Sequence, residues 1–184
     1  FMNEEEVKPE SDDLRSAAPS IDAESALLRE AYHFKEGADY AQSGQIFEDI
    51  LKRFGTMMKP RQKSVVHSEL AVLYFMLGDY DAAEKHAGLA TTFFQENEEA
   101  YAVLGKISVA RFRFPQARGY FSKISTENAA HHLGMCLVAL KLRNIIAAES
   151  FLGRAQALIP VPLKDMEYCL YRAYIRLLTG GAKE

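Results

Sequence analysis

The sequence predicts an all-α solenoid of about four helical hairpins, followed by a C-terminal capping helix. The first observation is a repeat: residues 70–83, which begin Leu-Ala and end in Ala, return 34 residues later as residues 104–117, which begin Leu-Gly and end in Ala. A period of this length is typical of stacked helical hairpins. The second observation is that small residues recur where two helix axes would cross, and no segment shows the alternation of a β-strand. Both observations favour helices alone.

The second helix of each hairpin is located by its small residue. These four residues are Ser43, Ala83, Ala117 and Ala148. Four positions later, each helix carries an apolar or small residue: Phe47, Ala87, Phe121 and Leu152. Three positions further on stand Ile50, Ala90, Ile124 and Ala155. Because seven residues make about two helical turns, each set lies on one face, which predicts the packing face of the second helices.

The first helices match this pattern less evenly. Their expected packing residues, hairpin by hairpin, are Leu27, Ala31 and Phe34; Leu70, Ala71 and Tyr74; Tyr101, Leu104 and Gly105; and Leu133, Gly134 and Leu137. The junction around residues 56–62 is longer than the others, and the link through residues 125–128 is shorter. Phe112 stands where a turn glycine is expected, and Pro115 is well placed to begin the helix that follows.

The two ends of the chain differ from the hairpin stack, which we expect to span residues 23–162. Residues 1–22 contain seven acidic residues against two basic ones, and they are predicted to be a disordered acidic arm. Residues 163–180 are predicted to form the capping helix, which ends at two glycines. The helix has an apolar stripe that is expected to cover the last hairpin: Met166, Leu170, Ala173, Tyr174 and Leu177.

Composition and charge exclude several classes of function. The net charge is −3, and most of the excess acid lies in residues 1–22, so the rest lacks the concentrated Lys and Arg of a nucleic-acid-binding surface. No apolar run approaches the roughly 18 residues that cross a bilayer. The N-terminus does not have the basic-then-apolar order of a signal peptide. We therefore expect a cytoplasmic protein that binds no nucleic acid and does not insert into membranes.

Residues able to carry chemistry are few and scattered. His132 and Cys136 are four residues apart, but a structural zinc site needs four ligands and nothing supplies the others. The remaining histidines are distributed over different predicted helices, without a neighbouring nucleophile. Both cysteines, Cys136 and Cys169, are expected to be buried free thiols. We therefore expect no metal, no cofactor and no enzymatic activity, with the histidines at the surface or tolerated within the fold.

The repeated pattern resembles the tetratricopeptide repeat (TPR) family over about residues 23–178, and Pro160 stands at the position of the closing proline of that motif. The resemblance implies a right-handed superhelix whose first helices line a concave inner wall that binds a protein or peptide segment. The residues that we expect to contact a partner there are Tyr32, Val72, Phe75, Met76, Lys106, Val109 and Met135. This wall is largely apolar, which favours hydrophobic anchoring of a segment. It differs from the basic groove of the TPR domains that clamp a chaperone's C-terminal carboxylate.

Within that family, residues 147–159 are similar to the last hairpin of the TPR chaperones of type III secretion systems, although those usually carry three hairpins. This resemblance implies a chaperone or adaptor for a secretion substrate. The alternative is a structural scaffold subunit that contacts a larger assembly through its convex face or capping helix. The sequence leaves open the identity of the partner and the possibility of a homo-oligomer.

Overall fold

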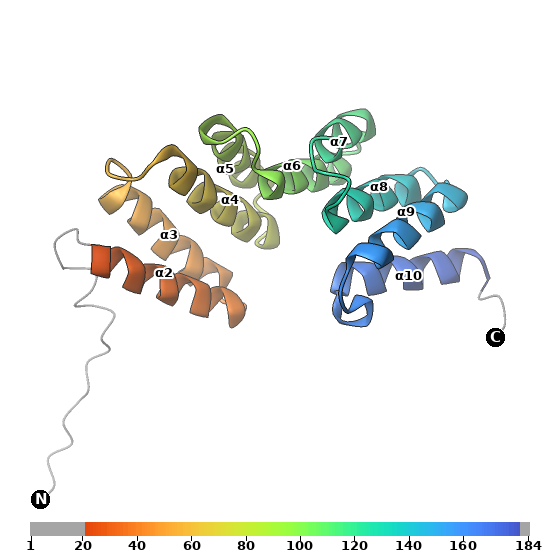
Figure 1. Cartoon of the computed structure of the whole chain (residues 1–184), viewed down its shortest axis with the longest axis horizontal. Helices are drawn as coiled ribbons and strands as arrows, with labels where there is room; N and C mark the ends of the chain where they lie inside the picture. Colours follow the sequence, from red (N-terminus) through yellow and green to blue (C-terminus); the bar gives the residue numbers. More distant parts are fainter. Residues whose placement is uncertain (1–20, 181–184) are drawn as a thin grey trace, which may run out of the picture.

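The computed structural model describes residues 21–180, which form nine α-helices, one short 3₁₀ helix and no strand. The helices are α2 (Ile21–Glu36), α3 (Tyr40–Phe54), α4 (Pro60–Met76), α5 (Tyr80–Phe93), α6 (Glu98–Ala110), α7 (Phe114–Phe121), α8 (Ala129–Lys141), α9 (Ile145–Leu158), η1 (Pro162–Lys164) and α10 (Met166–Leu178). They pair into four hairpins, with α10 after the last (Figure 1). The predicted all-α solenoid is confirmed. The predicted acidic arm lies outside the described residues, except for residues 21 and 22, which belong to α2.

The hairpins stack side by side into a curved array. In Figure 1, α2, α4 and α6 follow one another along its concave side, and α3, α5 and α7 lie on the opposite side. The same layer of first helices continues, since α6 contacts α8 and α8 contacts α10. No helix within residues 21–180 is both long enough and apolar enough to cross a membrane.

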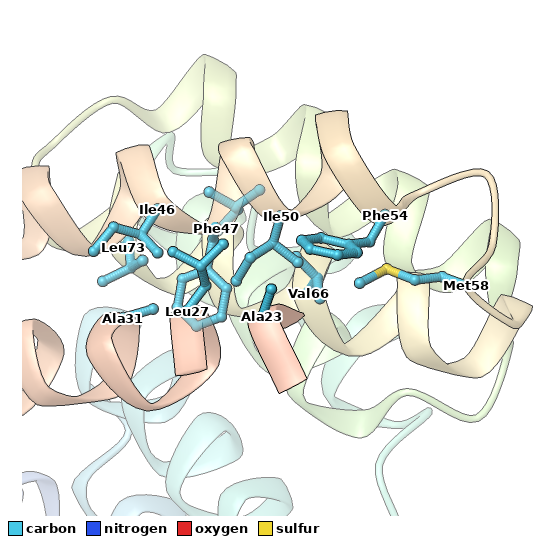
Figure 2. Packing of buried hydrophobic residues seen from close by; sticks show 11 residues of the cluster. Ala23, Leu27, Ala31, Ile46, Phe47, Ile50, Phe54, Met58, Val66 and Leu73 are labelled. Carbon is cyan, nitrogen blue, oxygen red and sulfur yellow. The ribbon is translucent and has the colours of Figure 1, made fainter. Parts of the chain in front are cut away.

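The predicted packing face of the second helices is confirmed. All twelve residues of the three predicted sets are buried. Figure 2 shows the result in the first hairpin, where Leu27 and Ala31 of α2 meet Phe47 and Ile50 of α3. The small residue can also tie the two helices together, because the Ser43 hydroxyl donates to the Ala31 carbonyl oxygen at 2.8 Å.

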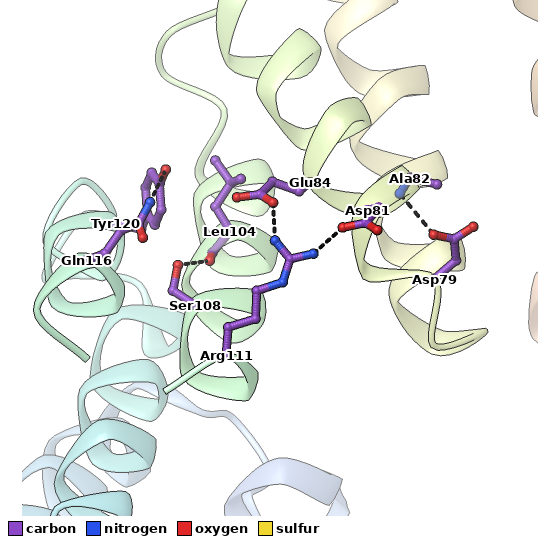
Figure 3. A network of polar contacts seen from close by, with 9 residues as sticks. All are labelled: Asp79, Asp81, Ala82, Glu84, Leu104, Ser108, Arg111, Gln116 and Tyr120. Carbon is purple, nitrogen blue, oxygen red and sulfur yellow. Dashed lines mark hydrogen bonds and ion pairs between the residues drawn. The ribbon is translucent and has the colours of Figure 1, made fainter. Parts of the chain in front are cut away.

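Each hairpin turns at one residue in the left-handed region, five positions before the small residue of its second helix. These residues are Ala38, Gly78, Phe112 and Arg143, with φ between 58° and 81°. In three of the four turns the next residue is an aspartate or asparagine whose side chain caps the following helix, as Asp79 does for the Ala82 N–H (Figure 3). In the third hairpin Arg113 stands there and gives no side-chain cap, so α7 begins at Phe114 without one.

These turns correct the predicted register of the fourth hairpin. In the first three hairpins a buried small residue lies seven positions before the left-handed residue, at Ala31, Ala71 and Gly105. Seven positions before Arg143 stands Cys136, which is fully buried. The prediction placed Leu133 and Gly134 in this role and was therefore wrong by two residues. Gly134 is as small as a residue at a helix crossing must be, but it makes a different contact.

That contact is the ring of Phe121, which lies against two glycines. A methyl group added at Gly105 of α6 or at Gly134 of α8 would come closer than 3.0 Å to the Phe121 side chain. Phe121 is fully buried at the end of α7. The third and fourth hairpins therefore approach each other around one aromatic ring that requires glycine at both positions.

The capping helix packs through a different face from the predicted one. Its buried residues are Tyr168, Tyr171 and Ile175, which join the cluster formed by α8 and α9. The apolar stripe expected to make this contact faces solvent instead. Because α10 is apolar on two faces, periodicity alone could not distinguish the face that packs from the face that does not.

Candidate protein-binding surface

Three of the seven predicted contact residues occupy equivalent positions on successive first helices. Tyr32, Val72 and Lys106 each lie six positions before the left-handed residue of their own turn, and Phe75 lies three positions before its turn. We call the surface formed by these positions on α2, α4 and α6 the inner face. Tyr32 is exposed, and Val72, Phe75 and Lys106 are half-buried, so all four are open to a partner. Met76 follows Phe75 at the end of α4 and is also exposed.

Two predicted residues are not available on the inner face. Val109 is buried with Phe121 and Val138, so it contributes to the core and is closed to a partner. Met135 lies two positions away from the position on α8 that is equivalent to Tyr32, Val72 and Lys106. This is the same two-residue error as in the predicted register of the fourth hairpin. It lines a hollow of about 160 Å³ between α7, α8 and α9, beside Arg118 and Phe151, on the other side of the stack.

The inner face also carries carboxylates that the sequence reasoning missed. The Tyr32 hydroxyl donates to Glu69 Oε1 at 3.0 Å, and Lys35 Nζ lies 2.5 Å from Glu69 Oε2. One hairpin further on, the Ser68 hydroxyl donates to Glu99 Oε2 at 3.1 Å. These bonds link α2 to α4 and α4 to α6. The predicted apolar wall is thus corrected to a mixed one, in which Glu69 joins the first hairpin to the second and Glu99 joins the second to the third.

The same polar contacts continue to the C-terminal helix. Lys106 of α6 pairs with Glu167 of α10 and so reaches past α8. Burial, followed by the neighbouring charge of Glu69, raises the pKa of Glu99. Burial and the charge of Glu69 also raise the pKa of the Tyr32 hydroxyl, which remains a hydrogen-bond donor at neutral pH. The partners are separated by 31 and 37 residues, which is close to one repeat, but this spacing alone does not distinguish them from other polar pairs one hairpin apart.

Apolar side chains gather at one edge of this surface. Phe75 at the end of α4 and Tyr80 at the start of α5 have ring centroids 5.5 Å apart. Met76 and Leu77 beside them are about half exposed. The second hairpin therefore offers aromatic and flexible apolar contacts next to the polar contacts of Glu69 and Glu99. This combination suits a protein segment that carries both apolar and polar side chains.

Several histidines are part of the packing, as one of the two expected alternatives describes. His131 Nδ1 lies 2.9 Å from the Phe121 carbonyl oxygen, and both His131 and His132 are buried, whereas His33 is exposed. His67 and His86 join α4 to α5 through their Nδ1 atoms, 3.0 Å apart. Burial, with the charge of His86 next, lowers the pKa of His67 to about 4.

Groups for metal binding or nucleophilic attack do not converge in the part of the chain that the structure describes. Within residues 21–180 no three His, Cys, Asp or Glu side chains come together as a metal site requires. Burial raises the pKa of the Cys136 thiol to about 12, so this thiol remains protonated and inert at neutral pH.

Comparison with solved structures identifies the same fold in two proteins. The chain is similar to TTC0263, a thermophilic TPR protein of Thermus thermophilus, with a TM-score of 0.74 and 23% identity over 86% of this chain and 84% of that one. It is also similar to PilF of Pseudomonas aeruginosa, with a TM-score of 0.62 and 16% identity over 94% of this chain and 78% of that one. No protein-family model and no curated protein sequence matches the chain. At these identities the likeness establishes the fold: the described chain is a TPR-like α-solenoid.

Proposed function

We propose that this protein is an interaction module that binds a segment of a partner protein on its inner face. The observation that carries the proposal is the equivalence of Tyr32, Val72 and Lys106, which present accessible side chains at the same position of three successive first helices. A surface with this repeat suits an extended or helical segment that runs along the stack. Phe75 and Met76 supply its apolar anchors.

The chemistry of the inner face limits the kind of segment that can bind. Apolar side chains would contact the Phe75 edge, while polar or basic groups would meet the carboxylates of Glu69 and Glu99. This mixed surface supports a general adaptor or chaperone role. The secretion-chaperone role suggested by residues 147–159 has no support from the comparisons, so the proposal does not include it.

The test is a pull-down with the full chain from source-cell lysate, followed by mass spectrometry and an affinity measurement on the recovered partner segment. Met76→Glu and Phe75→Glu should each weaken binding by about tenfold or more, the effect of losing an interface anchor. Met57→Glu is the matched control, because Met57 is also largely exposed but lies in the loop between α3 and α4. Equal retention of the partner by all three variants would remove the inner face from the function.

The second candidate is a scaffold subunit that uses another surface. The observation favouring it is the solvent-facing apolar stripe on α10. A partner that remains bound to the Phe75→Glu variant would support this alternative over inner-face binding.

A further inference from the structure

Helix α10 has the register of the first helix of a fifth hairpin. In each complete hairpin a small residue precedes the left-handed turn residue by seven positions. Ala173 precedes Gly180 by the same seven positions, and Gly180 has φ +77°. The buried face also matches: Tyr168, Tyr171 and Ile175 lie twelve, nine and five positions before the turn. The residues buried at the same positions of α4 are Val66, Glu69 and Leu73.

The remaining faces of α10 are uncovered in the described chain. In the complete hairpins the small residue of the first helix is buried, whereas Ala173 is exposed. Large apolar side chains around it are also exposed, by 85% at Met166, 63% at Leu170, 42% at Tyr174 and 78% at Leu177. Together they offer several hundred Å² of apolar surface, about the size of the patches that mark interaction sites on monomers. This is a face that ordinarily packs against another helix.

Next to this stripe lies a cationic hollow. It has a volume of about 260 Å³ between α9 and α10, and it is lined by Arg172 and Arg176 with Glu149 as its one acidic residue. The Tyr168 hydroxyl donates to Gln156 Oε1 at 2.8 Å, which leaves the Gln156 amide N–H groups to donate elsewhere. The hollow therefore offers donors and positive charge to a carboxylate.

The distribution of charge along the stack also favours an acidic partner at α10. Residues 111–180 contain ten Lys and Arg against four Asp and Glu, a net charge of +6, whereas residues 21–110 contain nine against fourteen, a net charge of −5. A second copy that docked α10 on α10 would bring two cationic ends together. The helix at the other end, α2, exposes mainly polar residues and gives no apolar match: Asp22, Arg29, Tyr32, His33 and Glu36. Charge and apolarity together favour a different protein with acidic flanks.

We propose that α10 docks an acidic amphipathic helix of a partner protein, which takes the place of the second helix of a fifth hairpin. A small residue of the partner helix packs over Ala173, as Ala83 and Ala148 pack in the complete hairpins. Its apolar residues cover Leu170 and Leu177, and its carboxylates pair with Arg172 and Arg176. This surface is separate from the inner-face residues on α4.

The experiment places a photo-cross-linking amino acid at position 170 of the full chain, with position 57 as the matched control. Irradiation in source-cell lysate and mass spectrometry of the adduct identify the segment that contacts α10. The expected result is a segment of another protein, attached at 170 and absent at 57, with helical apolar spacing and acidic flanks. A synthetic peptide of that segment should then bind the purified chain.

Two variants and one control define the outcome. Leu177→Glu and Arg176→Glu should each weaken the peptide by about tenfold, with Met57→Glu unchanged. All three side chains are solvent-exposed, so circular dichroism should show intact helices in every variant. Cross-links only to a second copy, to a basic or non-helical segment, or to nothing would overturn the proposal. Phe75→Glu should leave the adduct at 170 in place, which separates this test from that of the inner face.

Discussion

Replacement of Gly134 by alanine tests how closely the third and fourth hairpins pack. On propensity alone, alanine in the interior of α8 should stabilise the helix by about 1 kcal/mol. The structure predicts the opposite, because the added methyl group would come closer than 3.0 Å to Phe121. The ring is fully buried, and a methyl group added at Gly105 would approach it almost as closely. The ring therefore has little room to move away from the added group.

The magnitude follows from the balance of the two effects. Overpacking a close-packed core costs roughly 1–3 kcal/mol, and a fully buried ring that two helices already approach closely belongs at the upper end. After the gain in helix propensity, we expect Gly134→Ala to lower the free energy of unfolding by about 2 kcal/mol. For a chain of this size that corresponds to a decrease of about 4–8 °C in the midpoint of thermal unfolding.

The assay is thermal and urea unfolding followed by circular dichroism, with Gly88→Ala as the matched control. Gly88 lies within α5, and no atom lies within 4 Å of the position that an added Cβ would occupy, so this variant should gain up to about 1 kcal/mol. In a double-mutant cycle, Gly134→Ala should cost less stability in the Phe121→Leu background than in the wild type, because the smaller side chain leaves room for the added methyl group. If Gly134→Ala is as stable as the wild type or as stable as Gly88→Ala, the predicted clash between the added methyl group and the Phe121 ring is refuted.

Three further predictions concern a turn, a titrating pair and the inner face. Phe112→Gly should raise stability by about 1 kcal/mol, because Phe112 has φ 59° and its side chain is 77% exposed; a urea midpoint that falls would contradict this. The His67–His86 pair should make the fold less stable as the pH falls from 6.5 towards 4. The lowered pKa of His67 means that the unfolded chain binds the proton first, and this loss should shrink in His67→Gln when thermal midpoints are compared across that range. Lys35→Met should cost about 1.5–3 kcal/mol in urea unfolding, because buried Glu69 loses its cation. Glu69→Gln in the same chain should recover part of that loss, and strictly additive effects would show that the pair is not coupled.

The sequence was most informative where one residue had one role. Each small residue of the second helices, from Ser43 to Ala148, was assigned correctly because a side chain at a helix crossing must be small. Gly134 was misassigned because a glycine can have either of two roles. It can let two helix axes approach closely, or it can leave room for an aromatic ring from the preceding hairpin. The second role depends on where Phe121 lies, which spacing within α8 does not reveal.

The inner face shows a similar limit. Tyr32, Val72 and Lys106 could be placed by their offset from the packing set, but Glu69 and Glu99 could not, because each is held by a residue one hairpin earlier. These contacts depend on how successive hairpins lie against one another, which the spacing within one helix does not reveal. The misplacement of Met135 has the same origin, since a two-residue change of register turns a side chain through more than half a helical turn.

The two ends of the stack differ in a way that bears on function. A repeat array ordinarily ends in a helix whose outer face is polar, because that face has no neighbour. Helix α10 covers α8 and α9 through Tyr171 and Ile175, yet it presents Leu170 and Leu177 to solvent. A helix that served only to end the stack would gain solubility from polar residues at those positions. The spacing from Ala173 to Gly180 and the apolar outer face instead match the first helix of a hairpin whose outer face a second helix would cover. For this reason we expect a partner at α10 as well as on the inner face.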